Sequence, residues 1–428
     1  MTEAPNDAVP GPTDKGLADK PISAAYAERA GELRDALVGE LRARGKITSQ
    51  AVEAAFRVVP RERFLPAGTP LETAYGYDSS VVTKRDENGA AISSVSAAYI
   101  QARMLEQAEL RPGMTVLEIG SGGLNAALIA EIVGAEGRAV SVDIDPEVID
   151  RAAKFMDETG YSSRVRVLVA DAENGVPGEE LFDAIIVTVG AWDIPPAWLE
   201  QLAPTGTLVV PLIMNGVTRT FGFRREGDHL VSTSIEVAGF VPMQGIGRHS
   251  DTPLTVVDPA GKTVTLQFDT AAALALNDLD DVLRTEPTVA WSGVLFPNAT
   301  SWAGLYVWFA WYMPGFCRLR AEDGSVLDEH GRWFPFATVR GTGLAYLVIR
   351  PAMQDQGVEF GACAFGRDGK IAAATLVEQI KAWNRDGRNT EPTFAYWPTG
   401  SDETQQPADA AVLAKTHGVI TISWPVEE

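Results

Sequence analysis

A glycine-rich turn between two apolar runs is the feature that most constrains the fold of this chain. Residues 116–143 read VLEIGSGGLNAALIAEIVGAEGRAVSVD. An apolar run at 116–119 precedes three glycines, helical spacing follows at 124–133, and a second apolar run at 139–142 ends at Asp143. Short continuous apolar runs are typical of strands buried in a parallel sheet. The segment therefore predicts the strand, turn, helix and strand of a nucleotide-binding unit.

The polar residues of this unit indicate an adenosine cofactor with a cationic end. Asp143 stands about 20 residues after the glycines, where its carboxylate can accept hydrogen bonds from both ribose hydroxyls. Asn125 replaces the third glycine of the dinucleotide-binding pattern. Glu118 would repel a pyrophosphate but suits the cationic amino acid end of S-adenosylmethionine. The pattern favours a methyltransferase over a dehydrogenase. An ordinary buried turn would explain the glycines but not acids at both strand ends.

Strands and helices continue to alternate downstream. VRVLVAD places Asp171 at the end of a third strand, where its carboxylate could meet the adenine amino group, and a fourth strand is expected at 184–189. LEQLAPTGTLVVPL predicts a helix, a Pro-Thr-Gly turn and a fifth strand. The expected fold is an α/β, doubly wound, Rossmann-like sheet with its ligand at the carboxyl ends of the strands. The predicted cofactor-binding residues are Glu118, Gly120, Ser121, Gly122, Asn125, Asp143, Ile144, Asp171 and Ala172.

Two further motifs lie outside the cofactor unit. LVGELRARGKITSQAVEAAFRVVPRERFLP and VSAAYIQARMLE resemble the amino-terminal helices, the VPRE.F.P signature and the serine-containing turn of the protein L-isoaspartyl O-methyltransferases. The resemblance covers roughly residues 30–225 and implies that Ser96 is the active-site serine. Ser93 and Ser94 are alternatives that would require an insertion. Two departures are that KRDENGAAISS replaces the family's glycine-rich lead-in and Ala98 replaces its usual proline.

The GSGGLNAA turn, the SSVS segment and the long carboxyl-terminal extension resemble more closely a branch of that family. This branch accompanies ribosomally made peptides such as lanthipeptides, including the FxLD type, lasso peptides and graspetides. The resemblance implies methylation of one aspartate in a modified precursor peptide, whose ester closes to an aspartimide and can hydrolyse to isoaspartate. The alternative is general L-isoaspartate repair. A third possibility is a non-catalytic peptide-binding module, against which the intact cofactor residues speak.

The expected chemistry requires little beyond positioning. An aspartate side chain has a reference pKa of about 3.9, so it is already an ionised nucleophile at neutral pH and needs no general base. In-line alignment in a poorly solvated site should then supply most of the acceleration. Ser96 can hold one carboxylate oxygen by donating a hydrogen bond. Its alternative role is that of a helix N-cap before residues 97–108.

Composition agrees with a cytoplasmic enzyme of two domains. The 428 residues contain no apolar run long enough to span a membrane, and no signal peptide is visible. We expect a disordered lead-in at 1–25, a methyltransferase domain at 26–235 and an α+β substrate-docking domain at 236–428. A net charge of −21 argues against a nucleic-acid substrate and favours a basic or neutral peptide, although acidity also serves solubility.

No metal site is predicted. Cys317 and Cys363 are too few for a disulfide framework or a metal cluster. The histidines show no ligand spacing, and they are His229, His249, His330 and His417.

The second half of the chain predicts hairpins and two helices. The hairpin is expected at 252–269 and the helices at 271–284 and 374–385. The second helix should pack on a sheet through Leu376, Ile380 and Trp383. WAGLYVWFAWYMPGF at 302–316 is dense in aromatic rings, which indicates either a peptide-binding surface or a buried core.

Overall fold

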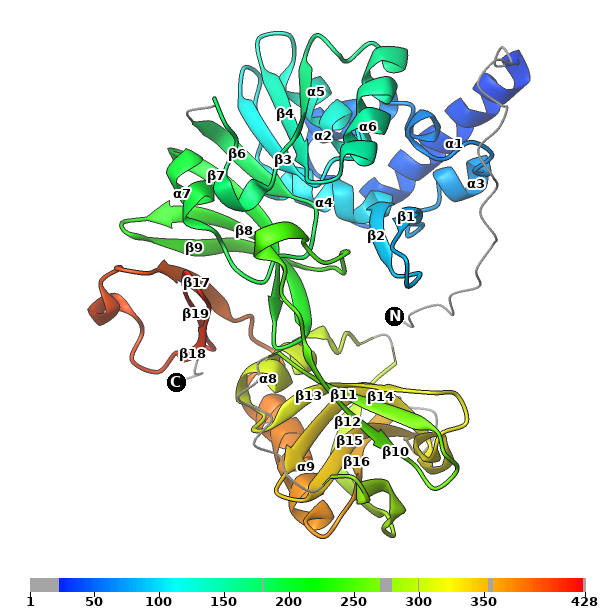
Figure 1. Cartoon of the computed structure of the whole chain (residues 1–428), viewed down its shortest axis with the longest axis vertical. Helices are drawn as coiled ribbons and strands as arrows, with labels where there is room; N and C mark the ends of the chain where they lie inside the picture. The colour runs from blue at the N-terminus through cyan, green and yellow to red at the C-terminus, as the bar shows by residue number, and fades with distance from the viewer. Residues whose placement is uncertain (1–22, 179–180, 270–278, 299, 353–356, 426–428) are drawn as a thin grey trace.

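The computed structural model describes residues 23–178, 181–269, 279–298, 300–352 and 357–425. In these residues one sheet of ten strands and one of seven organise the chain (Figure 1). The larger sheet has the order β18-β19-β17-β9-β8-β7-β6-β3-β4-β5, and the smaller has the order β10-β11-β13-β14-β15-β16-β12. A separate hairpin pairs β1 (Val81–Arg85) with β2 (Ala91–Val95).

The larger sheet is parallel on one side and antiparallel on the other. Its parallel strands are β3 (Thr115–Ile119), β4 (Arg138–Asp143), β5 (Val165–Val169), β6 (Phe182–Val187) and β7 (Leu202–Met214). Its antiparallel strands are β8 (Val217–Glu226), β9 (His229–Val237), β17 (Thr393–Pro398), β18 (Ala411–Ala414) and β19 (Gly418–Ser423). The strand order reverses between β3 and β6, which is where a doubly wound sheet binds its ligand. The predicted Rossmann-like α/β fold is confirmed.

Helices cover this sheet. They are α1 (Ala24–Ala43), α2 (Gln50–Val58), α3 (Leu71–Ala74), α4 (Ala98–Ala108), α5 (Leu124–Val133), α6 (Pro146–Thr159) and α7 (Pro196–Gln201). Short 3-10 turns are η1 (Arg61–Phe64), η2 (Ala172–Asn174) and η3 (Gly245–Gly247). Helix α5 has the predicted bounds, because Gly123 adopts a φ of 84° at its start and Gly134 a φ of 71° at its end.

Side chains alternate between the two faces of the strands, as the pleat requires. Val116 and Ala184 face the apolar cluster that contains α4 and α5. Leu117 and Ile185 face a second cluster, which continues without a break to Trp308 and other residues after 290. The two sheets therefore share one hydrophobic core.

The smaller sheet is antiparallel. Its strands are β10 (Thr252–Val257), β11 (Thr263–Phe268), β12 (Thr288–Phe296), β13 (Phe316–Ala321), β14 (Arg332–Arg340), β15 (Gly343–Pro351) and β16 (Val358–Phe365). Other short turns are η5 (Val282–Arg284), η6 (Val326–His330) and η8 (Glu403–Gln405). Helix α9 (Gly369–Asp386) packs on this sheet. We call residues 252–386 the second domain.

Two local predictions in this region are confirmed. The expected hairpin is β10 paired with β11, with Thr252 opposite Phe268. The helix expected at 374–385 lies within α9, and its predicted apolar face is buried. By contrast, most of the helix expected at 271–284 lies outside the described residues, and its last residues form the short turn η5.

The aromatic segment forms helix α8 (Ala303–Tyr312), which lies between the two sheets. Trp308 and Phe309 are buried, and Trp308 donates a hydrogen bond from Nε1 to Gln379 at 2.8 Å. From the first sheet, Arg219 donates to the Ala303 carbonyl at 2.6 Å. These contacts support the buried-core alternative rather than a peptide-binding surface.

The division of the chain differs from the one predicted at residue 236. Strands β8 and β9 extend the first sheet, and β17, β19 and β18 return to it after the second domain (Figure 1). Residues 393–423 thus belong to the first sheet, although the sequence analysis assigned them to the second domain. Pairing of β17 with β9 joins residues more than 150 positions apart, for which strand patterns carry no signal.

The amino-terminal prediction falls mainly outside the described residues. Of the lead-in expected at 1–25, only the last three positions are described, and there Ser23 caps α1 by accepting a hydrogen bond from Tyr26. In the described part of the chain, the helices are all too short or too polar to cross a membrane.

Candidate active site

Two adjoining pockets lie at the carboxyl ends of the parallel strands, where the strand order reverses. The first pocket encloses about 510 Å³ and the second about 370 Å³, and Gly120 lines both. Predicted cofactor residues in the first pocket are Gly120, Asp143, Ile144, Asp171 and Ala172. Predicted site residues in the second are Ser96, Glu118, Gly120, Gly122 and Asn125. The fold therefore gathers nearly all of the predicted site into one continuous cleft.

Asp143, at the end of β4, is held by backbone donors. Its Oδ2 accepts a hydrogen bond from the Ser121 amide at 3.0 Å, and its Oδ1 accepts one from the Asp145 amide at 2.9 Å. Burial raises the pKa of Asp143, and these backbone hydrogen bonds oppose the rise. Ser121 lines neither pocket; its amide orients Asp143 and its hydroxyl accepts from Ser141 at 2.9 Å.

Asp171 lies two residues beyond β5, in contact with residues far away in the sequence. Its Oδ2 accepts a hydrogen bond from the Ile246 amide at 2.9 Å. A Cβ on Gly245 would come within 2.3 Å of the same oxygen, so this close approach requires glycine. Ile246 belongs to residues 238–251, which connect β9 to β10 and which we call the crossover.

The crossover forms one wall of the first pocket through Pro242, Met243 and Gln244. It is anchored at Gly190, whose amide donates to the Val241 carbonyl at 2.8 Å and whose carbonyl accepts from the Met243 amide at 2.9 Å. The connection to the second domain is thus part of the cofactor pocket.

Glu118, at the end of β3, is buried in the wall of the second pocket. Burial raises its pKa to about 7, and a hydrogen bond from the Ser141 hydroxyl opposes the rise. The side chain of the neighbouring Asn125 also opposes the rise, and its buried Oδ1 lacks a hydrogen-bond partner within the described residues. Buried polar groups normally have partners, so this pocket wall is suited to a polar, cationic ligand.

Gly120 has to be glycine in this turn. Its φ is 96°, and an added Cβ would lie 2.6 Å from Oγ1 of Thr188. Thr188 donates from that oxygen to the Gly120 carbonyl at 2.7 Å. Because glycine has no side chain, a ligand can lie over the end of β3.

The three candidate serines have different surroundings. Ser94 and Ser96 line the second pocket. Ser93 points elsewhere, because its Oγ lies 2.8 Å from Oγ1 of Thr83 and accepts from Arg151 at 3.4 Å. No described residue hydrogen-bonds to the hydroxyl of Ser96, which is only half-buried.

The alternative role of Ser96 as a helix N-cap is wrong. Ala97 occupies the N-cap position of α4, and no side chain caps that end of the helix. The helix begins one residue later than expected, because Ala97 keeps an extended backbone with ψ of 146°. Ser96 therefore has no capping function that would explain its presence in the pocket.

A buried arginine supports the Ser96 turn from behind. Arg61, from the VPRERF motif, donates to the Ser96 carbonyl at 2.7 Å and to the Ala74 carbonyl at 2.7 Å. It also donates to the side chain of Gln101, which lines the second pocket. Burial lowers the pKa of Arg61 to about 10, so it stays charged at neutral pH.

The β1–β2 hairpin, which leads into Ser96, is joined to the start of helix α6 by ion pairs. Lys84 forms ion pairs with Asp145 at 2.6 Å and with Glu147 at 2.7 Å. Ile92 from the hairpin and Asp145 both line the first pocket. The hairpin therefore covers part of the cleft.

Sequence reasoning missed several residues of the cleft. Arg61 and Gln101 stand inside motifs that the sequence analysis quoted, and Thr188 ends a predicted strand, so each had a local signal. The crossover residues Pro242–Gln244 had none, because they reach the pocket through non-local bridges.

A parallel sheet with a glycine turn after β3, carboxylates at the ends of β3 and β4 and another just beyond β5 defines a Rossmann-like methyltransferase. A family model described as protein-L-isoaspartate(D-aspartate) O-methyltransferase matches residues 32–247. The chain belongs to this family, and it is an S-adenosylmethionine-dependent carboxyl O-methyltransferase. The match ends within the crossover, so the second domain lies outside it.

Relatives carry the same family name. A protein-L-isoaspartate O-methyltransferase of Methanopyrus kandleri is 40% identical over 180 residues, which cover 42% of this chain and 76% of the relative. One of Pyrobaculum neutrophilum is 34% identical over 209 residues, which cover 49% of this chain and 97% of the relative. A solved structure of the same name has a TM-score of 0.46 and 24% identity, and covers 59% of this chain and 92% of that chain.

The residues of the cleft fit S-adenosylmethionine. Glu118 and Asn125 are buried and suit a cationic amino acid end, since Oδ1 of Asn125 is without a partner among the described residues; the glycine turn leaves the space that a Cβ would fill. Asp143 and Asp171 are acceptors at positions suited to ribose and adenine. We therefore use this cofactor to interpret the cleft.

Proposed function

We propose that this enzyme esterifies the free carboxyl group of isoaspartyl residues in proteins or peptides. The observation that carries the proposal is the second pocket, in which the half-buried Ser96 faces the same space as Glu118 and Asn125. A carboxylate held by Ser96 would lie beside the cationic end of the cofactor. The names of the relatives support this substrate.

The cofactor is placed by its charged and hydrogen-bonding groups. Glu118 and Asn125 hold the amino acid end, Asp143 accepts from the ribose, and Asp171 accepts from the adenine amino group. Each carboxylate oxygen has about two lone-pair sites, so Asp143 and Asp171 can accept these bonds besides those from the backbone. S-adenosylmethionine supplies a methyl group on a sulfonium, which any ionised carboxylate can attack.

The enzyme's own residues position the substrate. Ser96 donates a hydrogen bond to one carboxylate oxygen and leaves the other oxygen to react. Arg61 fixes the turn that carries Ser96 and places a buried positive charge next to it. Oppositely charged reactants lose charge in the transition state, so a cleft covered by the β1–β2 hairpin and the crossover favours the reaction by excluding water.

A second candidate is methylation of an aspartate in a modified ribosomal peptide, with closure to an aspartimide. The inserted second domain favours it, because the crossover lines the cofactor pocket and leads directly into β10. A precursor docked on the second domain would be held close to Ser96. The methyl ester helps closure, since an alkoxide leaves more readily than a carboxylate oxygen when the next amide nitrogen attacks.

Mass spectrometry with S-adenosylmethionine and three substrates distinguishes these functions. The substrates are an isoaspartyl peptide, the same peptide with ordinary aspartate, and the modified precursor peptide encoded nearest the gene. We expect a methyl ester on the isoaspartyl peptide and none on its aspartyl control. Methylation followed by loss of methanol on the precursor alone would establish the second candidate. Ser96→Ala is the control for enzyme dependence, and an absence of methylation on all three substrates would overturn both candidates.

A further inference from the structure

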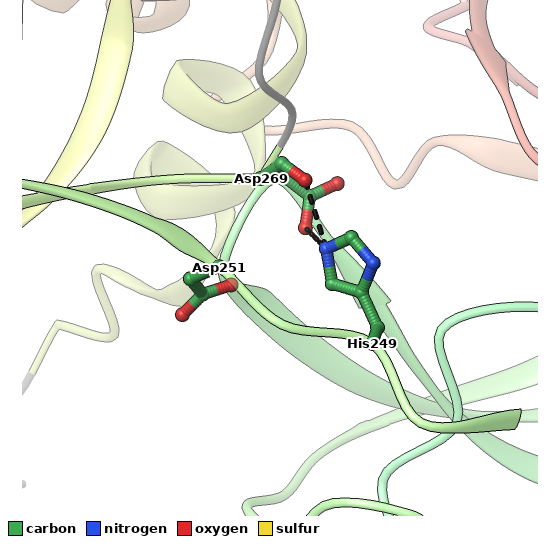
Figure 2. Close-up of side chains that lie close together, drawn as sticks. All are labelled: His249, Asp251 and Asp269. Atoms are coloured by element: carbon green, nitrogen blue, oxygen red, sulfur yellow. Dashed lines mark hydrogen bonds and ion pairs between the residues drawn. The ribbon is translucent and has the colours of Figure 1, made fainter.

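A cluster of one histidine and two aspartates lies at the base of the β10–β11 hairpin. His249 and Asp251 precede β10, and Asp269 follows β11 (Figure 2). One ligand atom from each side chain lies within 4.8 Å of the other two. None of these residues takes part in the proposed methyl transfer.

The hairpin register brings the cluster together. Thr252 pairs with Phe268, so the residues just outside this pair, Asp251 and Asp269, are neighbours across the two strands. His249 stands two positions before Asp251, which places it on the same side. The sequence predicted no metal, because its two cysteines are too few and its histidines show no ligand spacing, whereas here carboxylates would supply the other ligands.

The imidazole has a fixed position. His249 stacks on Trp192 with ring centroids 4.4 Å apart and an angle of 9° between the planes. Trp192 in turn donates from Nε1 to Oδ2 of Asp269 at 3.1 Å. One tryptophan thus orients two members of the cluster.

Asp269 carries the strongest indication of a ligand. Its side chain is 2% exposed, and its Oδ1 is buried without a hydrogen-bond partner among the described residues. This oxygen points toward His249, whose Nε2 lies 3.4 Å away (Figure 2). A buried carboxylate oxygen left unpaired is costly, so an additional electropositive partner would stabilise it.

The charges of Lys415 and Asp269 attract each other, but no described cationic side chain donates a hydrogen bond to Oδ1 of Asp269. Lys415 lies with Nζ 4.2 Å over the Trp192 ring, but it donates instead to the Ile213 carbonyl at 2.8 Å. Asp251 and Asp269 bring two carboxylates close together, each within 4.8 Å of the other through one oxygen. Two carboxylates side by side are a common setting for a bound cation.

We propose that His249, Asp251 and Asp269 bind one divalent transition-metal cation of the Zn²⁺ or Mn²⁺ class. A ligand set of one imidazole nitrogen and carboxylate oxygens suits these ions, whereas Mg²⁺ prefers oxygens alone. The Nε2 of His249 now donates to the Asp269 carbonyl at 2.8 Å. The cation takes the place of that proton at Nε2, and the ring keeps its single proton on Nδ1, as a neutral imidazole ligand does.

The geometry needs a small adjustment at one ligand. Atoms bound to one Zn²⁺ at about 2.1 Å lie about 3.4 Å apart in a tetrahedral site, which is less than the largest separation in the cluster. Asp251 is exposed, so its side chain can rotate inward without disturbing the core. His249 and Asp269 are already held at ligand spacing.

The cation would fasten the crossover to the second domain. His249 lies at the end of the crossover that lines the cofactor pocket, and Asp269 lies at the end of β11. The metal therefore acts as a structural clip at the junction between the two sheets. This inference is independent of the proposed function, and its test uses no methyl transfer.

Calorimetric titration of untagged, chelator-treated full-length protein tests the site. We expect one equivalent of Zn²⁺ or Mn²⁺ to bind, Mg²⁺ to bind at least about tenfold more weakly, and the melting temperature to rise. Asp251→Asn should weaken binding at least about tenfold, since it removes one charged ligand from an exposed position. Asp269→Asn keeps an acceptor for Trp192 and should weaken binding as well.

The matched control is His330→Ala, which removes a histidine of the second domain outside the cluster. It should leave the affinity and stoichiometry unchanged. Stoichiometry below about 0.2 by elemental analysis, or equal affinity of Asp251→Asn and wild type, would overturn the proposal. Circular dichroism of each variant establishes that it is folded before the titration is compared.

Discussion

Nη2 of Arg61 donates a hydrogen bond of 2.7 Å to the carbonyl oxygen of Ser96. The contact joins η1 to the turn that enters the second pocket, across 35 positions of sequence. Arg61 is buried, and its described hydrogen bonds all go to uncharged acceptors. A charge in this setting is retained at an energetic cost, which favours a role in placing Ser96.

Arg61→Met should destabilise the protein and lower turnover. The variant leaves the buried carbonyls of Ala74 and Ser96 without a donor, which should reduce the free energy of unfolding by about 3 kcal/mol. We expect kcat to fall while the Kd of S-adenosylmethionine stays within about twofold. Denaturant unfolding and steady-state kinetics measure the two effects. Arg63→Met is the control, because Arg63 lies in the same turn η1 but forms an ion pair with Glu158 at 3.9 Å. Equal effects of both variants would contradict the role of Arg61.

Ser96→Ala should lower kcat about 10- to 100-fold. It removes one hydrogen bond to a charged carboxylate, an interaction that contributes about 1.5–3 kcal/mol. Cofactor affinity should not change, since Ser96 faces the substrate side. Ser93→Ala is the matched control, because its hydroxyl is turned toward Thr83 and Arg151. If Ser93→Ala lost more activity than Ser96→Ala, the assignment of the serine would be reversed.

Binding of S-adenosylmethionine should strengthen as the pH rises through about 7. Glu118 has a pKa of about 7 in the free protein because it is buried, and only its ionised form attracts a cationic group. Below that pH, binding has to release a proton, so affinity should fall by up to about tenfold per pH unit. Calorimetry between about pH 5.5 and about pH 8.5, roughly 1.5 units on either side of neutrality, measures the slope. A slope that persists in Glu118→Gln would exclude this residue as its cause.

The same shift makes the ionised Glu118 destabilising in the free enzyme. Its pKa rises from 4.5 to about 7 on folding, so the cost is absent below pH 4.5, grows between these values and is complete above about pH 7. Glu118→Gln should therefore raise the free energy of unfolding at pH 8 by up to about 3 kcal/mol, with no gain at pH 4.5. Denaturant titrations at the two pH values measure the difference.

Phe394→Ala should destabilise the two sheets together, so that they unfold in a single transition. Phe394 is buried on β17, and its ring contacts Phe221 of the first sheet and Trp311 of α8. We expect a loss of about 3–5 kcal/mol and one transition seen equally by fluorescence and circular dichroism. Val412→Ala on the exposed side of β18 should have little effect. Two separate transitions in the wild type would contradict a shared core.

Local signals predicted which residues the fold gathers at the carboxyl ends of β3 and β4. The glycine turn, the strand ends and helix α5 depend on neighbours within about 25 residues, so spacing and residue type were sufficient to place Glu118 and Asp143. The motif resemblance placed Ser96 in the same cleft. The N-cap expectation failed because helix starts vary by a residue or two around the same motif.

The non-local contacts could not be predicted from the sequence. The bond between Ile246 and Asp171 spans 75 positions, and the pairing of β17 with β9 depends on a domain being inserted between them. His249 and Asp269 meet only because a hairpin register aligns them. In each case the partners obey no fixed spacing, so only the fold brings them together.

The return of β17, β18 and β19 to the first sheet has a consequence for biosynthesis. Strand β9 keeps an open edge while the ribosome makes the whole second domain, because its partner β17 is translated only afterwards. The methyltransferase sheet can therefore be completed only after the inserted domain has emerged. A nascent chain stalled within the second domain would expose this edge to chaperones and to other chains. The enzyme can therefore mature only after its inserted domain has been synthesised.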